Sequence, residues 1–405
     1  MKILLMAQHY APEEVSGAVL ATELAEGLVA RGYQVTFVTC APSYPLGKVF
    51  SGYQNNLYAI ENRNGVKVIR IWSYITASKN FWARILNYAT FSIMALLGGC
   101  MAQSPDVIFS YSPPLPLGLA AWLLSRLQRV PWVLRIEDLY PDAAIATGVL
   151  RNRVAIAFFA YMEKFLYRQA THISVISDGF RRNLLAKGIP PEKISVTPVW
   201  ADPDIICPLP KENDFRLKHS LLGKFVVLYA GNLGITSALE DVIAAAALLC
   251  DQQEIVFLLV GEGGKKDALI QQAREIKQVI FLPFQPRSSV AEMLSAADIS
   301  LVTLNAESSS YSLPSKVFNI MASGRPLLTV TPAGSEVAQL LELAQCGCNI
   351  PPDSPDELAE KIVELSSMPD LLIAWGENAR AYLLTRFSRQ VCLDLYESML
   401  IRAAV

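Results

Sequence analysis

A lysine at the expected start of a helix is the first residue in this chain that could do chemistry. It is Lys316 in the stretch "YSLPSKVFNIMASGRPLL", residues 311–328, and it follows Pro314 and Ser315. Proline suits a first helical turn, because its missing N–H would have no partner there. Since the positive end of the helix dipole adds to the lysine charge, the pattern predicts an anion site at Lys316.

Two glycine turns that follow expected strands add to this prediction. "LYAGNLGITSALEDVI" holds Asn232 between glycines, and "FLLVGEGGKKDAL" places Gly263 ahead of Lys265 and Lys266. A dinucleotide fingerprint would need glycine at position 266, so the pattern argues against a Rossmann dehydrogenase. Glycines let a ligand approach the backbone and lysines neutralise phosphate, which favours a diphosphate. For either lysine alone, a solvated helix start is an equal alternative.

Two further positions in the second half of the chain indicate the same kind of ligand. Phe284 lies in a turn where its ring could stack on a base or wall it off. Glu307 lies in a serine-rich loop that offers hydroxyl and N–H groups. Together with Lys316, these positions predict a site for one anionic, hydroxyl-rich ligand.

Carboxylates stand at a strand end in the first half of the chain. "VPWVLRIEDLYPDAAIATG" puts Glu137 and Asp138 just beyond a buried strand, where they face a ligand crevice. They could instead cap the next helix or pair with Arg135. In "QHYAPEEVSGAVLATELAEGL", Gly17 opens a helix whose N–H groups could meet an anion. An ordinary loop with Ser16 as N-cap is the alternative, and one glycine does not assign a function.

The sequence does not predict a metal site. Its seven cysteines are scattered without a CxxC pair, so we expect reduced core thiols. The Asp-x-Asp that begins at Asp202 lies in a proposed linker without other ligands. Only three histidines occur, too dispersed for a triad, and His9 alone is expected near the cleft, in a structural role.

The order of apolar segments predicts the fold. A chain of 405 residues suggests two to three domains, at roughly 150 residues each. Continuous apolar strands alternate with helical patterns, which is typical of parallel sheets covered on both faces. The proline-rich stretch 199–222 separates two similar halves. We therefore expect an α/β, doubly wound protein with two Rossmann-like domains facing a central cleft.

Charge and hydropathy limit the partners. The net charge of −2 gives no general attraction to nucleic acid. The N-terminal apolar run is too short for a signal peptide, so we expect a cytoplasmic protein. The apolar run 85–102 is interrupted by polar residues and is not expected to span a membrane. Basic and aromatic residues ahead of it (Lys79, Phe81, Trp82, Arg84) predict peripheral contact with the inner membrane face through 79–101, with a core helix as an equal alternative.

Longer motifs carry a resemblance to a known family. "APEEVSGA…LAEGLVARGYQVTFVT" and "PSKVFNIMASGRP" resemble the opening unit and the donor-site helix of the family 4 retaining glycosyltransferases, which have the GT-B fold. "SYPLGKVFSGY", "GVKVIRIW" and "IEDLYPD" resemble the WcaI/WbuB-like subgroup of bacterial exopolysaccharide and O-antigen assembly. The resemblance implies an acceptor-binding domain over 1–200, a sugar-nucleotide domain over 201–385, and a helix over 386–405 that crosses back to the first domain.

The resemblance also implies roles for individual residues. Gly17 would approach the diphosphate from the first domain, and Phe284 would contact the base. Lys316 would bind the phosphates, with Leu313–Ser315 on the uridine side. The sugar nucleotide would be a substrate, and the resemblance implies neither cofactor nor metal.

Several positions depart from the family pattern. The family keeps two glutamates eight positions apart, where this chain has Tyr311 and Asn319. Asparagine can still bond ribose hydroxyls, and we expect Glu307 to replace the missing glutamate near the sugar. Asn232 and Ser237 stand where arginine and lysine are common. The phosphate charge is therefore expected to fall more heavily on the remaining lysines.

The expected activity follows from the resemblance. It is transfer of a hexose from a UDP-sugar, with glucose preferred over an N-acetylhexosamine, to a growing lipid-linked glycan, with retention of configuration. Asp138 would orient the acceptor hydroxyl. The alternatives are a UDP-sugar 2-epimerase of the same fold and a non-catalytic subunit of a polysaccharide assembly.

Overall fold

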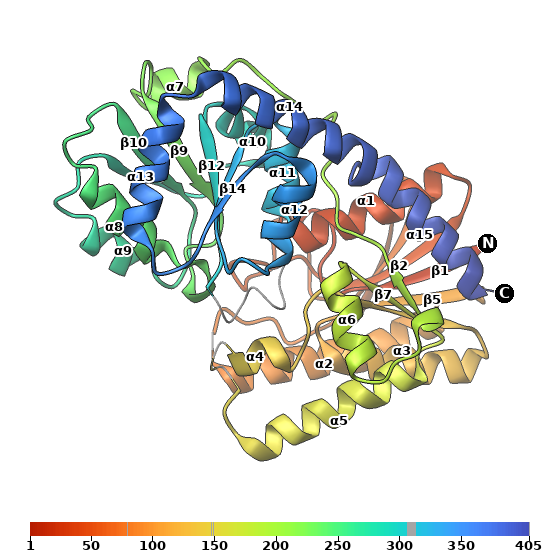
Figure 1. The fold of residues 1–405 in the computed structure, drawn as a ribbon. Coiled ribbons are helices and arrows are strands. Elements are labelled where there is room, and N and C mark those ends of the chain that lie inside the picture. The colour runs from red at the N-terminus through yellow and green to blue at the C-terminus, as the bar shows by residue number, and fades with distance from the viewer. Residues whose placement is uncertain (79, 147, 149, 306–312, 405) are drawn as a thin grey trace. The chain divides into compact units, whose positions relative to one another are not determined.

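The chain folds into two compact α/β units (Figure 1). The computed structural model describes residues 1–405 apart from 79, 147, 149, 306–312 and 405. The first unit comprises Met1–Val199 and Cys392–Val405, and the second comprises Trp200–Val391. Each is built on its own sheet with helices packed on it, as the alternation of apolar strands and helical segments predicts.

The first unit contains a sheet of eight described strands in the order β3-β4-β2-β1-β5-β6-β7-β8. Their bounds are β1 Lys2–Met6, β2 Gln34–Cys40, β3 Tyr58–Arg63, β4 Val66–Ile71, β5 Val107–Ser112, β6 Trp132–Ile136, β7 His172–Val175 and β8 Ile194–Val196. Every described neighbour pair is parallel except β3–β4. The central strands β5 and β6 are buried along their whole length, because helices cover both faces.

Helices flank this sheet on both faces. They are α1 Ser16–Ala30, α2 Phe81–Cys100, α3 Leu115–Gln128, α4 Asp142–Ala146, α5 Arg153–Gln169, α6 Asp178–Ala186 and α15 Arg389–Ala404. Helix α3 packs against both α2 and α5, and Figure 1 shows these three along one side of the sheet. On the other side, α15 is held to α1 by Arg31, whose guanidinium contacts Asp394 and Glu397 at 2.6 Å each. The end of the chain thus folds with its beginning.

The second unit contains a sheet of six described strands, all parallel, in the order β11-β10-β9-β12-β13-β14. Their bounds are β9 Phe225–Ala230, β10 Ile255–Val260, β11 Val279–Leu282, β12 Ile299–Thr303, β13 Leu327–Val330 and β14 Gly347–Ile350. The helices are α7 Asp214–Lys218, α8 Leu239–Leu248, α9 Lys266–Gln272, α10 Arg287–Ser295, α11 Lys316–Ala322, α12 Glu336–Ala344, α13 Pro355–Ser366 and α14 Pro369–Arg386. A core of buried strand residues packs on α8 and α13.

The strand order of each sheet reverses at one place. In the first sheet β1 pairs with β2 on one side and with β5 on the other. In the second sheet β9 pairs with β10 on one side and with β12 on the other. The loops that leave the carboxyl ends of such a strand pair diverge to opposite faces of the sheet, and ligands of doubly wound folds bind in the crevice between them. The fold therefore gives each unit one preferred ligand position.

A buried arginine fixes the start of the second unit. Arg216 is fully buried, donates to the carbonyls of Ala296 and Lys224 at 2.8 and 3.0 Å, and contacts Asp298 at 2.5 Å. Its removal leaves two carbonyl groups without this donor, and it leaves Asp298 with only Lys211 and the Val226 N–H among the donors found in the described chain. The guanidinium therefore ties α7 to the strand end and the helix that flank it.

We expect Arg216→Ala to lower the free energy of unfolding of the second unit by about 3–5 kcal/mol, because the buried Asp298 loses its fully buried partner and two carbonyl groups lose their donor. Denaturant unfolding of the full chain measures this change. Lys361→Ala, which removes a surface pair with Glu364, is the matched control and should change stability by less than about 1 kcal/mol. Equal effects of the two variants would contradict the role given to Arg216.

Candidate functional site

Lys316 lies at the strand-order reversal of the second sheet. Its Nζ is 3.9 Å from the centroid of the Tyr229 ring, on the strand β9. Gly231, which follows β9, has a φ of 156°, and a Cβ built on it would lie 2.8 Å from the Lys316 Nζ. This φ favours glycine, and the absence of a side chain lets the ammonium group lie against the backbone at the carboxyl end of β9.

The two glycine turns of the second unit pack against each other and against this lysine. The backbone carbonyl of Asn232 accepts hydrogen bonds from the hydroxyls of Tyr229 and Ser237, at 2.8 and 2.7 Å. A Cβ on Gly263 would lie 2.3 Å from the Leu233 carbonyl oxygen and 2.7 Å from the Asn232 Oδ1. The structure therefore brings together Asn232, Gly263 and Lys316, which the sequence places in three separate segments.

The other two predicted lysines are paired. Lys265 forms an ion pair with Glu240, and Lys266 forms one with Glu262 at 2.7 Å. These carboxylates offset the lysine charges locally. Among the residues that the structure describes, no carboxylate pairs with Lys316. The cationic group available to a ligand at the strand-order reversal is thus Lys316.

The remaining predicted residues of this unit lie in its loops and in α11. Phe284 is 64% exposed in the loop after β11, so its ring is accessible to a base. The segment Leu313–Ser315 and Asn319 are half-buried before and within α11. Glu307 and Tyr311 lie outside the described residues.

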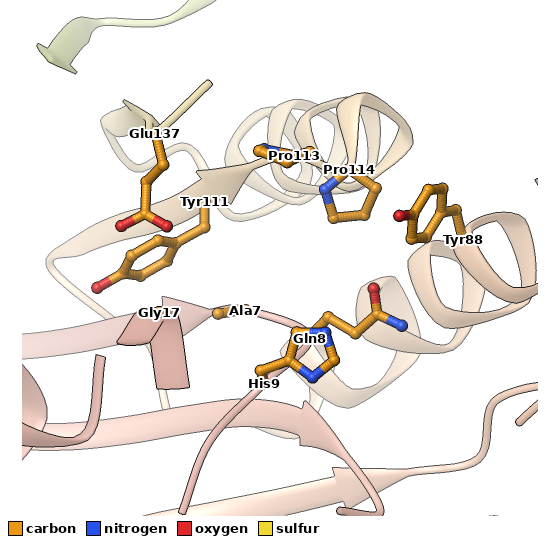
Figure 2. Close-up of a pocket in the computed structure, with 9 residues that line it drawn as sticks. All are labelled: Ala7, Gln8, His9, Gly17, Tyr88, Tyr111, Pro113, Pro114 and Glu137. Carbon is orange, nitrogen blue, oxygen red and sulfur yellow. The ribbon is translucent and has the colours of Figure 1, made fainter. Parts of the chain in front are cut away.

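A pocket of about 120 Å³ opens at the strand-order reversal of the first sheet (Figure 2). Its walls are formed by Ala7, Gln8, His9, Gly17, Tyr88, Tyr111, Pro113, Pro114 and Glu137. They follow β1, lie in or after β5 and β6, or come from α1 and α2. Figure 2 shows Tyr111 and Glu137 at one end of the pocket and Tyr88 at the other, with Gln8 and His9 between. Polar and aromatic groups thus converge where the fold favours a ligand.

Of the two predicted carboxylates, Glu137 lines this pocket. A Cβ on Gly17 would lie 3.6 Å from the Glu137 Oε2, and the Glu137 Oε1 is 3.8 Å from the Arg135 Nε. Burial raises the pKa of Glu137 to about 7, although Arg135 acts in the opposite direction. Asp138 is exposed beside it, and desolvation of its carboxyl group still raises its pKa. At this edge of the sheet, the carboxyl group of Glu137 therefore exchanges its proton nearer to neutrality than an ordinary glutamate does.

His9 also lines the pocket, next to a buried carboxylate. Its Nδ1 is 2.8 Å from the Glu13 Oε2, and the Glu13 side chain is 1% exposed. The Glu13 Oε1 accepts hydrogen bonds from the backbone N–H groups of Ser43 and Tyr44, at 2.7 and 2.8 Å. The sequence signal for this arrangement is a histidine and a glutamate four residues apart in the loop after the first strand, and sequence reasoning gave it no weight.

The linker carboxylates have a structural partner. Asp202 accepts a hydrogen bond from the Asp204 backbone N–H and contacts Arg389 at 3.2 Å. Within the described part of the chain, His, Cys, Asp and Glu side chains do not form a cluster of three or more that could hold a metal ion.

Comparison with known families agrees with this architecture. Residues 17–200 match the family model described as "Glycosyl transferase 4-like domain", and residues 211–382 match "Glycosyl transferases group 1". The chain is 28% identical over 385 residues to the "Putative colanic acid biosynthesis glycosyl transferase WcaI" of Escherichia coli K12, covering 91% of this chain and 93% of the relative.

Solved structures share the fold. The sucrose-phosphate synthase of Thermosynechococcus elongatus has a TM-score of 0.77 at 18% identity, over 99% of this chain and 98% of that one. Anabaena HepE, solved in complex with UDP, has a TM-score of 0.73 at 17% identity, over 99% and 100%. Both halves of the chain match glycosyltransferase models, and each unit is an α/β domain of the kind that makes up the GT-B fold, so the chain belongs to the family 4 glycosyltransferases.

Proposed function

We propose that this glycosyltransferase moves a hexose, preferably glucose, from a UDP-sugar to a growing lipid-linked glycan, with retention of configuration. The observation that carries the proposal is the position of Lys316, whose ammonium group lies at the strand-order reversal of the second sheet without a carboxylate partner among the described residues. Anabaena HepE, which is similar in fold, was solved with UDP-glucose, and WcaI is named for colanic acid biosynthesis. These names support a UDP-sugar donor and a polysaccharide product.

In this reaction, a positively charged group stabilises the negative charge that develops on the leaving diphosphate. When the bond between the anomeric carbon and the diphosphate oxygen breaks, its electron pair stays on the diphosphate. Lys316 would stabilise that charge. The acceptor oxygen then bonds to the anomeric carbon on the same face, and its proton passes to the departing phosphate. Asp138 would orient the acceptor hydroxyl.

The donor prediction is tested by the thermal stability of the wild-type protein with UDP-, GDP-, ADP- and CMP-sugars. A ligand that binds only the folded state raises the midpoint of unfolding, by an amount that grows with its concentration over its Kd. We expect UDP-glucose to give the largest shift. A larger shift with GDP- or ADP-glucose would overturn the UDP assignment, and no shift with any nucleotide sugar would favour a non-catalytic subunit.

Lys316→Ala should lower kcat about 10²-fold or more, because a preorganised donor to the leaving group acts mainly in the transition state. UDP release from UDP-glucose in the presence of acceptor measures the loss. Lys361→Ala, which removes a lysine on the surface of α13, is the control and should retain wild-type turnover. Near-wild-type turnover of a folded Lys316→Ala protein would remove this lysine from the mechanism.

A lipid-linked acceptor would be met at a membrane, and α2, α3 and α5 present a suitable surface. Exposed apolar side chains follow helical spacing on each helix: Trp82, Leu86, Ile93 and Leu97 on α2, Leu123 and Leu127 on α3, and Val154, Phe158 and Tyr161 on α5. Within the described chain, no helix is both long and apolar enough to cross a bilayer. We propose that these three helices, which we call the apolar helix face, lie on the membrane surface.

Charge on the apolar helix face favours an anionic membrane. Arginines and lysines accompany the apolar residues on all three helices (Arg84, Arg126, Arg153, Lys164, Arg168). In the described sequences of these helices the one acidic residue is Glu163, which is buried and pairs with Lys187 at 2.7 Å. Lys79, which we expected to contribute, lies outside the described residues. The surface is thus apolar and basic, as interfacial helices are.

Flotation with vesicles containing phosphatidylglycerol tests this surface. We expect the wild-type protein to float with anionic vesicles and to float less with phosphatidylcholine alone. The double variants Ile93→Ser/Leu97→Ser and Phe158→Ser/Tyr161→Ser should each weaken partitioning about tenfold or more, because two buried apolar side chains are lost from the interface. Leu343→Ser, at a residue 72% exposed on α12, is the control. Wild-type recovery only in the soluble fraction would exclude the membrane contact.

A further inference from the structure

His9 is a pocket residue with no part in the mechanism proposed so far. It follows β1 at the carboxyl edge of the first sheet, and its ring lies edge-on to Tyr44 at a centroid distance of 5.4 Å. Its Nδ1 contacts the buried Glu13, while its side chain keeps 34% of its surface exposed. A histidine that is fixed on one edge and open on the other is arranged to meet a ligand.

Glu13 determines which nitrogen of this ring carries the proton. Burial alone would raise the pKa of Glu13, but the hydrogen bonds from His9 and from the backbone N–H groups of Ser43 and Tyr44 outweigh it and lower the pKa. Glu13 is therefore a carboxylate near neutral pH and can only accept hydrogen bonds. The Nδ1 of a neutral His9 must then donate, which leaves Nε2 with an unshared electron pair.

Nothing in the described part of the first unit uses that electron pair. The hydrogen bond to Glu13 is the one found for the His9 ring, and it occupies Nδ1. The side chain of the neighbouring Gln8 is also held in place, because its Nε2 donates a hydrogen bond to the Asn87 Oδ1 at 2.6 Å. Two side chains with acceptor atoms are thus held in defined orientations at the pocket, before any ligand binds.

The walls around His9 match a saccharide. Tyr88 and Tyr111 offer ring faces for the C–H groups of a sugar, and Gln8 and Glu137 offer groups for its hydroxyls. The titratable groups in contact with the imidazole are Glu13 and Tyr44, and those that line the same pocket are Tyr88, Tyr111 and Glu137. The Arg84 guanidinium donates to the Tyr88 hydroxyl at 3.4 Å.

We infer that the His9–Glu13 pair binds the acceptor: Nε2 of His9 accepts a hydrogen bond from a hydroxyl of the saccharide in this pocket, and Glu13 positions the ring. The inference rests on the proposed transfer to a glycan. It assigns His9 as a residue that contacts the acceptor and Glu13 as a positioning residue that acts through it. It makes the pocket selective for groups that donate a hydrogen bond at that position.

Three variants separate the two nitrogen atoms. His9→Asn keeps a donor toward Glu13 but has no atom at the place of Nε2, whereas His9→Gln can place an amide oxygen there. Glu13→Gln presents an NH₂ group to Nδ1, so it should reverse the tautomer and make Nε2 a donor. Each variant leaves the residues of the second unit untouched.

Kinetics with UDP-glucose and a panel of p-nitrophenyl hexosides gives the first readout. We expect His9→Asn and Glu13→Gln to lower kcat/KM for the acceptor about tenfold, as loss of one hydrogen bond does, with the KM for UDP-glucose unchanged. His9→Gln should recover part of the loss. Wild-type acceptor kinetics in folded His9→Asn would overturn the inference, and so would an equal rise in both KM values, which indicates a structural role.

Imidazole nitrogen NMR gives a readout that does not depend on turnover. The chain has three histidines, and the signal lost in His9→Asn identifies His9. We expect the Nδ1–H tautomer in the wild type, reversal in Glu13→Gln, and a shift of the Nε2 signal when a hexoside is added. An Nε2–H tautomer, or no shift with any hexoside, would overturn the inference. If no UDP-sugar binds the wild type, the proposed function fails, while the hexoside titration still tests the pocket on its own.

Discussion

Two strands, β1 in the first sheet and β9 in the second, each pair in parallel with a neighbour on both sides. The position that each fold favours for a ligand depends on this pairing. Parallel registers bring the carboxyl ends of neighbouring strands to one edge, and the strand order reverses at these pairs. Loops of distant sequence must then leave the sheet close together. This is why Glu137 meets Gly17 in the first unit, and why Lys316 meets Gly231 in the second.

Glycines allow the turns after β9 and β10 to approach closely beside Lys316. A Cβ on Gly261, which has a φ of 147°, would lie 1.8 Å from the carbonyl oxygen of Gly231, and one on Gly263 would strike Leu233. The two turns can therefore approach only where side chains are absent. The backbone N–H groups of Gly231 and Leu233 donate to the carbonyls of Val260 and Glu262, at 2.9 Å each, so hydrogen bonds between the two turns hold them together beside the lysine.

Much of the fold is predictable from the sequence, because a strand that is buried on both faces has a continuous apolar sequence. Strands such as β9 (FVVLYA) and β10 (IVFLLV) are continuous apolar runs of this kind. The strands β3, β8 and β14 give no such pattern, since β3 is a polar antiparallel edge, β8 has three residues, and β14 (GCNI) is a short edge strand. The pairing of Lys265 with Glu240 was equally hidden, because no local pattern joins side chains 25 positions apart. The fold class was predictable, whereas the charge balance around each lysine required the structure.

The two units hold groups of different charge. The second unit holds a cation against its backbone, and the first holds the carboxyl group of Glu137, whose pKa is raised by burial to about 7. His9 differs, because Glu13 fixes its tautomer at every pH at which that carboxylate stays ionised and the ring stays neutral. In the acceptor role inferred for His9, recognition through a fixed imidazole would not depend on the protonation state of Glu137 in the same pocket.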